Sequence, residues 1–67
     1  MGAVVVEKTP PEILAEAAKA RQEAGRFRRA ALIISDELVV DSLKARAGEL
    51  ETLATMLEAQ AAKVAAR

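Results

Sequence analysis

Apolar residues recur along most of the chain at alternating steps of four and three, and this spacing constrains the fold more than any other feature. A first series runs through Ile13, Ala17, Ala20, Ala24, Phe27, Ala31, Ile34 and Leu38. A second series runs through Val40, Leu43, Ala47, Leu50, Ala54, Leu57, Ala61 and Val64. Such steps place all members of a series on one face of a helix, as in the heptads of packed helices. The sequence therefore predicts an all-α fold with two heptad seams.

The two seams are out of phase, and the break falls within "SDELV" at residues 35–39. A continuous helix can absorb such a slip as a stutter, or the chain can reverse direction there. When the chain is folded back about Glu37, a large residue faces an alanine in five of the seven layers that form. Core packing favours that alternation, because opposed large residues push helices apart and opposed small ones leave voids. We therefore expect an antiparallel helical hairpin, with helices over about residues 9–35 and 37–66.

The start of the first helix has a clear signal, whereas the turn does not. In "TPPE", Thr9 can cap the helix, Pro10 suits the first helical position, and Glu12 completes a capping box. No glycine lies near Ile34 to end the helix in a left-handed conformation, which is the best argument for a continuous helix. Ser35 or Asp36 is expected to cap the second helix instead.

Residues 1–8 differ in composition from the helical domain that we assign to residues 9–67. The run Val4–Val6 is β-branched and favours extended structure, so we expect a short extended or flexible arm. The alternative is a strand that pairs with a second chain. Gly25 and Gly48 lie beside the seams, where each marks a bend, a close contact or a tolerated surface position.

The hairpin is expected to associate, because a chain of 67 residues buries little surface on its own. Neither disulfides nor a zinc site can staple the fold, since cysteine and histidine are absent. Large apolar residues also lie off the seams, namely Leu14, Leu32, Ile33, Val39, Leu53 and Met56. Two hairpins that form a four-helix bundle would cover most of them, and a two-fold homodimer is the commonest arrangement. The pattern does not distinguish a parallel from an antiparallel dimer.

The residues expected to form the association surface are the larger members of the seams and two residues beside them. They are Phe27, Ile34, Leu43, Leu50, Leu53, Met56 and Leu57. The partner is a second copy or another helical protein.

The sequence does not indicate enzymatic activity. Histidine, cysteine, tyrosine and tryptophan are all absent, so we predict no catalytic, cofactor-binding or metal-ligating residue. No apolar run reaches the roughly 18 residues of a membrane span, and "MGAVVVEK" does not resemble a secretory signal. We expect a cytoplasmic protein with neither a cofactor nor a membrane partner.

Four arginines form the one notable charge feature: Arg21, Arg26, Arg28 and Arg29. They fit a solvated face with ion pairs, a contact with an acidic protein, or a contact with DNA or RNA phosphates. Glu16 and Arg21 also have the spacing of ion pairs between parallel coiled-coil helices, as do Glu23 and Arg28. The net charge of zero argues against a dedicated nucleic-acid binder.

The function that these features favour is a small, non-enzymatic protein–protein interaction module. It would act by homodimerisation and by helical contact with a partner protein, as an adaptor, scaffold or inhibitor. The alternative is a small DNA- or RNA-binding regulator, either with a basic patch or with a ribbon-helix-helix order of strand, helix and helix. The expected architecture is similar to ROP-type helical hairpins, a format also common among small phage- or plasmid-encoded proteins, and that similarity carries no function.

Overall fold

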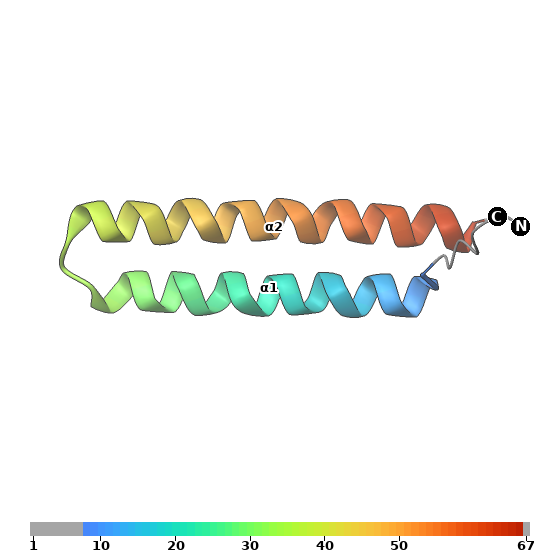
Figure 1. Cartoon of the computed structure of the whole chain (residues 1–67), viewed down its shortest axis with the longest axis horizontal. Coiled ribbons are helices and arrows are strands. Elements are labelled where there is room, and N and C mark those ends of the chain that lie inside the picture. The colour runs from blue at the N-terminus through green and yellow to red at the C-terminus, as the bar shows by residue number, and fades with distance from the viewer. Residues whose placement is uncertain (1–7, 67) are drawn as a thin grey trace, which may run out of the picture.

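The fold is an antiparallel hairpin of two long helices (Figure 1). The structure is a computed structural model that describes residues 8–66. Helix α1 spans Pro10–Ile33 and helix α2 spans Glu37–Ala65, and they are joined by residues 34–36. The predicted all-α hairpin is therefore confirmed. The arm predicted over residues 1–8 lies outside the described residues except for Lys8, whose Nζ pairs with the Glu16 carboxylate.

Helix α1 begins where the capping signal predicts. Thr9 has extended backbone angles, with φ −73° and ψ 156°, and its Oγ1 accepts a hydrogen bond from the Glu12 N–H at 3.4 Å. The Thr9 carbonyl accepts the first helical bond from the Ile13 N–H at 3.0 Å. Pro10 occupies the first helical position, where its missing N–H costs nothing.

The turn reverses the chain without a left-handed residue. No residue in the described range has a positive φ. Instead Ile34 and Asp36 are both extended, with φ −99° and ψ 135° for Ile34 and φ −75° and ψ 114° for Asp36. The Asp36 Oδ1 accepts hydrogen bonds from the N–H groups of Leu38 at 2.9 Å and Val39 at 3.4 Å. The continuous-helix alternative is therefore wrong, because two extended residues and an aspartate cap make the turn that a glycine would otherwise make.

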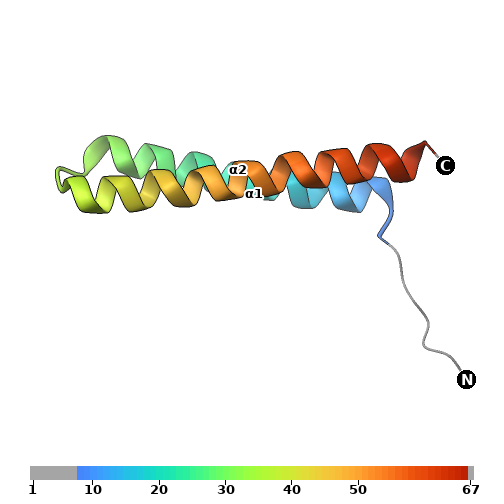
Figure 2. The same cartoon turned by 90° about the horizontal axis from the view of Figure 1, so that it is seen from above.

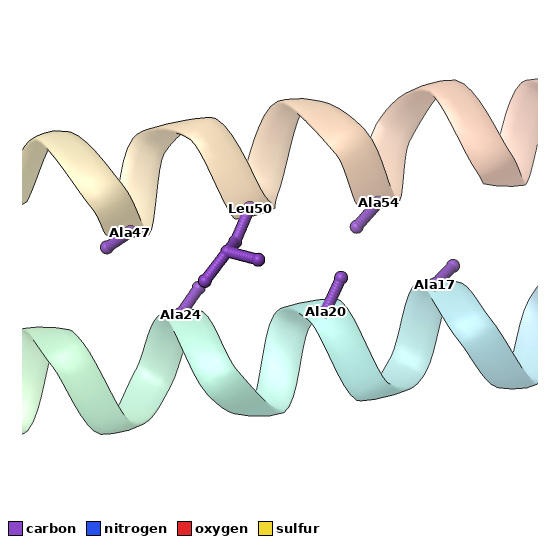
Figure 3. Close-up of a cluster of buried hydrophobic side chains, with 6 residues drawn as sticks. All are labelled: Ala17, Ala20, Ala24, Ala47, Leu50 and Ala54. Carbon is purple, nitrogen blue, oxygen red and sulfur yellow. The ribbon is translucent and has the colours of Figure 1, made fainter.

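The core is the seam between the two helices, in the predicted register. Figure 3 shows Leu50 pointing across to Ala24, and Ala20 facing Ala54. The buried residues are Ile13, Ala17, Ala20, Ala24, Ala31, Ala47, Leu50, Ala54 and Ala61. Seven of these nine are alanines, so the core is thin, and Phe27 and Leu57 pack against it as partly buried large residues.

One member of the first seam is placed differently from the prediction. Leu38 was expected to continue the apolar stripe of the first helix, but 79% of it is exposed. The reason is that α1 ends at Ile33, so Leu38 belongs to the first turn of α2 and points away from α1. The out-of-phase spacing of the second seam begins only after this residue.

Nothing within residues 8–66 covers the outer faces of the hairpin. Seen from above, the two helices cross at a shallow angle and form a single layer (Figure 2). Helix α1 also runs unbroken through Gly25, where a ribbon-helix-helix order would need a boundary between two helices. What remains available for function is therefore the surface of one pair of helices.

Candidate interaction surfaces

The residues predicted to mediate association fall into two groups. Leu50 is buried between the helices, and four others are half-buried along the seam, namely Phe27, Ile34, Leu43 and Leu57. Leu53 and Met56 instead face outward, with 46% and 64% of their surface exposed. The first group packs along the seam between the helices, and the second group is the more exposed of the two.

An open groove follows the outward side of α2. It is lined by Leu53, Met56, Leu57, Ala59, Gln60 and Lys63. Among the lining residues, Leu57 is half-buried, whereas Leu53 and Met56 are exposed. Since these side chains lie about one turn apart, the groove runs along the helix and fits a second helix better than a compact ligand.

A second set of exposed apolar residues flanks the turn. It consists of Leu32, Ile33, Leu38 and Val39, whose exposed fractions are 84%, 85%, 79% and 42%. We call these four residues the turn cap. Leu32, Ile33 and Val39 stand out in the sequence as large apolar residues off the seam. Leu38 did not stand out, because its spacing continues the first seam. Its exposure follows only from the end of α1 at Ile33, which places Leu38 on α2.

Two of the four arginines are held by glutamates of the opposite helix. Arg21 donates to the Glu58 carboxylate through Nε at 2.9 Å and Nη2 at 2.6 Å, and it also reaches the Thr55 hydroxyl at 3.3 Å. Arg28 donates to Glu51 in the same two-pronged way, at 2.8 and 2.5 Å. Both pairs lie on one side of the seam, one heptad apart. The glutamates that pair with Arg21 and Arg28 inside the hairpin are thus on α2, not the α1 glutamates singled out by the spacing of parallel helices.

These pairs shift the titration of both partners. The hydrogen bond from Arg21 and its charge hold the pKa of Glu58 below the ordinary value, against a smaller opposing effect of burial. The hydrogen bond from Arg28 likewise lowers the pKa of Glu51, and Arg21 adds to the effect. The pKa of each arginine is raised in return. All four side chains keep 40–47% of their surface exposed, so water and salt screen these pairs.

Arg26 and Arg29 are the arginines left for an outside contact. Both are exposed, and neither forms an ion pair with another residue of the range 8–66. The predicted cluster of four is therefore divided, with Arg21 and Arg28 bridging the helices. Sequence spacing alone did not reveal this division, because it depends on which α2 residues face α1.

The described part of the chain holds no group of three acidic, histidine or cysteine residues arranged to bind a metal ion. Neither α1 nor α2 is both long and apolar enough to cross a membrane. The fold and its surfaces define an antiparallel helical hairpin with an alanine-rich seam and exposed apolar patches. No protein-family model, curated protein or solved structure matched this chain.

Proposed function

We propose that this protein is a non-enzymatic interaction module that associates with itself and contacts a partner protein through its helices. One observation carries the proposal: seven large apolar residues of the hairpin are exposed. They are Leu14, Leu32, Ile33, Leu38, Val39, Leu53 and Met56, with exposed fractions between 42% and 85%.

The energetic argument compares these residues with the core. Full burial of one large apolar side chain is worth about 1.5–3 kcal/mol. The whole stability of a folded domain is typically about 5–15 kcal/mol. Only two large residues, Ile13 and Leu50, are buried within the hairpin, whereas seven are exposed. Association that covers several of the seven would therefore contribute a free energy comparable with the whole stability of a small domain.

The two patches suit different contacts. The residues that line the groove are spread over nearly three turns of α2, from Leu53 to Lys63, which suits a helix lying alongside it. The turn cap lies at one end of the hairpin, where Asp36, Glu37 and Asp41 add three carboxylates near its apolar side chains. A partner protein that presents apolar residues beside lysine or arginine would complement the turn cap. We assign self-association to the long side of the hairpin and partner contact to its end.

The experiment that tests the proposal is sedimentation equilibrium over a wide range of protein concentration, with helix content followed by circular dichroism. We expect the average mass to rise from the 7.1 kDa of one chain towards twice that value. A helical chain that stays at 7.1 kDa up to millimolar concentration would contradict self-association.

Nucleic-acid binding is the second candidate, and it is favoured by the exposed Arg26 and Arg29. A gel shift with random duplex DNA at low salt tests it, because phosphate contacts weaken steeply as salt rises. Binding that is lost with added salt, and lost in an Arg26→Gln, Arg29→Gln variant, would support this candidate. An absence of binding at low salt would remove it.

A further inference from the structure

The outward side of α2 carries a third series with heptad spacing, separate from the buried seam. It consists of Glu49, Leu53, Met56, Gln60 and Lys63, which we call the outer stripe. Steps of four and three place these residues on one face of α2. Four of the five line the groove described above, and the fifth, Glu49, extends it by one turn.

The outer stripe faces an open side of the hairpin. On the opposite side of the seam, Arg21 and Arg28 bridge to Glu58 and Glu51 and close the space between the helices. On the side of the outer stripe, Leu53 and Met56 remain 46% and 64% exposed. Along the middle and C-terminal part of α2, the exposed large apolar residues therefore lie on the side that lacks these bridges.

The charges of the outer stripe are opposite in sign at its two ends. Glu49 lies seven residues before Met56, and Lys63 lies seven residues after it. Since a helix rises about 1.5 Å per residue, each charge is about 10 Å from Met56 along the axis. A second copy that lies antiparallel, with Met56 opposite Met56, therefore brings each Glu49 opposite the Lys63 of the other copy.

A parallel arrangement gives the reverse result. It places Glu49 opposite Glu49 and Lys63 opposite Lys63, so that like charges repel at both ends. Two-fold dimers require a surface that is complementary to itself, and the outer stripe has that property only in the antiparallel orientation.

We propose that two hairpins dimerise by antiparallel packing of their α2 helices along the outer stripe, with the two-fold axis at Met56. This inference rests on the proposed self-association and specifies its surface and orientation. Leu53 of each copy packs near Gln60 of the other, and the Glu49 and Lys63 charges close the two ends of the contact. Glu49 also accepts a hydrogen bond from Arg46 at 3.1 Å, but this pair is exposed and leaves the second carboxylate oxygen of Glu49 free to bind.

The contact is centred on α2 because the stretch of α1 that lies alongside the outer stripe offers no large apolar counterpart on this side, Ile33 being further along towards the turn. By their heptad positions, the α1 residues that flank the same face are Glu12, Glu16, Lys19, Glu23 and Arg26. All of these are charged, so they suit the solvated rim of an interface and not its centre.

The test reverses the two charges separately. In an antiparallel dimer, Glu49→Lys creates two Lys–Lys contacts and Lys63→Glu creates two Glu–Glu contacts. We expect each variant to raise the dissociation constant of the homodimer roughly tenfold at low salt, since two attractive pairs become repulsive. An equimolar mixture of the two variants restores both attractions in a heterodimer and should return the dissociation constant to the parent value. Sedimentation velocity measures all three samples.

Lys44→Glu provides the matched control, because Lys44 is exposed on α2 but lies outside the outer stripe. It should leave dimerisation unchanged, and circular dichroism should show equal helix content in every variant. In a parallel dimer the single variants would match the parent and the mixture would bind more tightly than the parent, which would overturn the orientation. A dimer insensitive to all these changes would overturn the outer stripe while leaving self-association intact. A parent protein that stays monomeric would contradict both proposals.

Discussion

Leu50 is the large residue at the centre of the seam. It is only 6% exposed and points at Ala24 (Figure 3). Leu50→Ala would leave an alanine facing an alanine, and core truncations of this kind cost about 2–5 kcal/mol. We expect the urea midpoint of unfolding to fall sharply or the fold to be lost. Leu32→Ala removes the same side chain from a site that is 84% exposed and should have little effect. Equal loss from both variants would contradict the seam.

Gly48 has no structural requirement for glycine. A Cβ added there meets no heavy atom within 4 Å, and the residue lies in the middle of α2. Neither a bend nor a close contact accounts for it, which leaves a tolerated surface position. Gly48→Ala should raise the free energy of unfolding by up to about 1 kcal/mol, because alanine favours the helix. Denaturation by urea measures this gain. A loss of stability would show that another residue fills the space beside Gly48 in the assembled protein.

At the residue scale, the spacing of the apolar residues predicted which of them lie on the seams and which lie beside the seams. It did not separate the roles of Leu50 and Leu53, because both were assigned to one association surface. The structure places Leu50 inside the hairpin and leaves Leu53 outside, three residues further along the helix. A rotation of about 300° over three residues explains the difference, and it can be read from the sequence only once the core face is known.

The start of α2 depends on one side chain. Asp36 accepts hydrogen bonds from the Leu38 and Val39 N–H groups, and its negative charge lies at the positive end of the helix. Asp36→Ala should lower the free energy of unfolding by about 0.5–2 kcal/mol. Asp36→Asn keeps an acceptor oxygen and should retain most of that energy. If both variants unfold at the same urea concentration as the parent, the cap has no role in the turn.

The ion pairs between the helices predict a pH dependence. Because the pKa values of Glu51 and Glu58 are lowered in the folded state, the unfolded state binds more protons just below the ordinary glutamate pKa of 4.5. The stability that the pairs contribute is thus fully present above pH 4.5 and is lost as pH falls through the lower folded-state pKa values. We expect the urea midpoint to fall in this acid range.

The matched variant for this prediction is the double substitution Glu51→Gln, Glu58→Gln. It removes both titrating groups and should flatten the acid part of the midpoint-against-pH curve. It should also reduce the difference between low and high salt at pH 7, because both pairs are exposed to solvent. An unchanged acid slope would mean that other carboxylates govern the pH dependence.

At the scale of elements, the sequence predicted the helix start at Thr9 and the reversal within residues 34–39 because these follow from local capping and periodicity. The conformation of the turn was not predictable, since extended residues at Ile34 and Asp36 leave no compositional sign comparable to glycine. The partners of Arg21 and Arg28 were also missed. They depend on the contact of two helices more than twenty residues apart in the chain, and sequence spacing within one helix does not encode it.

For the molecule as a whole, self-association should couple stability to concentration. If only the folded chain dimerises, raising the protein concentration shifts the equilibrium towards the folded state. We expect the midpoint of thermal unfolding to rise over a hundredfold range of concentration. The Glu49→Lys variant should show a weaker rise, because its dimer is destabilised. Circular dichroism melting curves at several path lengths give this comparison, and a midpoint that is independent of concentration would argue against a folded dimer.

The alanine-rich seam has a consequence for how the molecule responds to temperature. The heat capacity of unfolding follows the apolar area newly exposed to water, roughly 12–15 cal/mol/K per residue in ordinary globular proteins. Seven alanines among nine buried residues give the single hairpin little such area. Its stability curve should therefore be shallow, with no pronounced optimum between cold and warm conditions. Covering Leu53 and Met56 in a dimer would add curvature, so that the assembled protein and the lone hairpin would favour different temperatures.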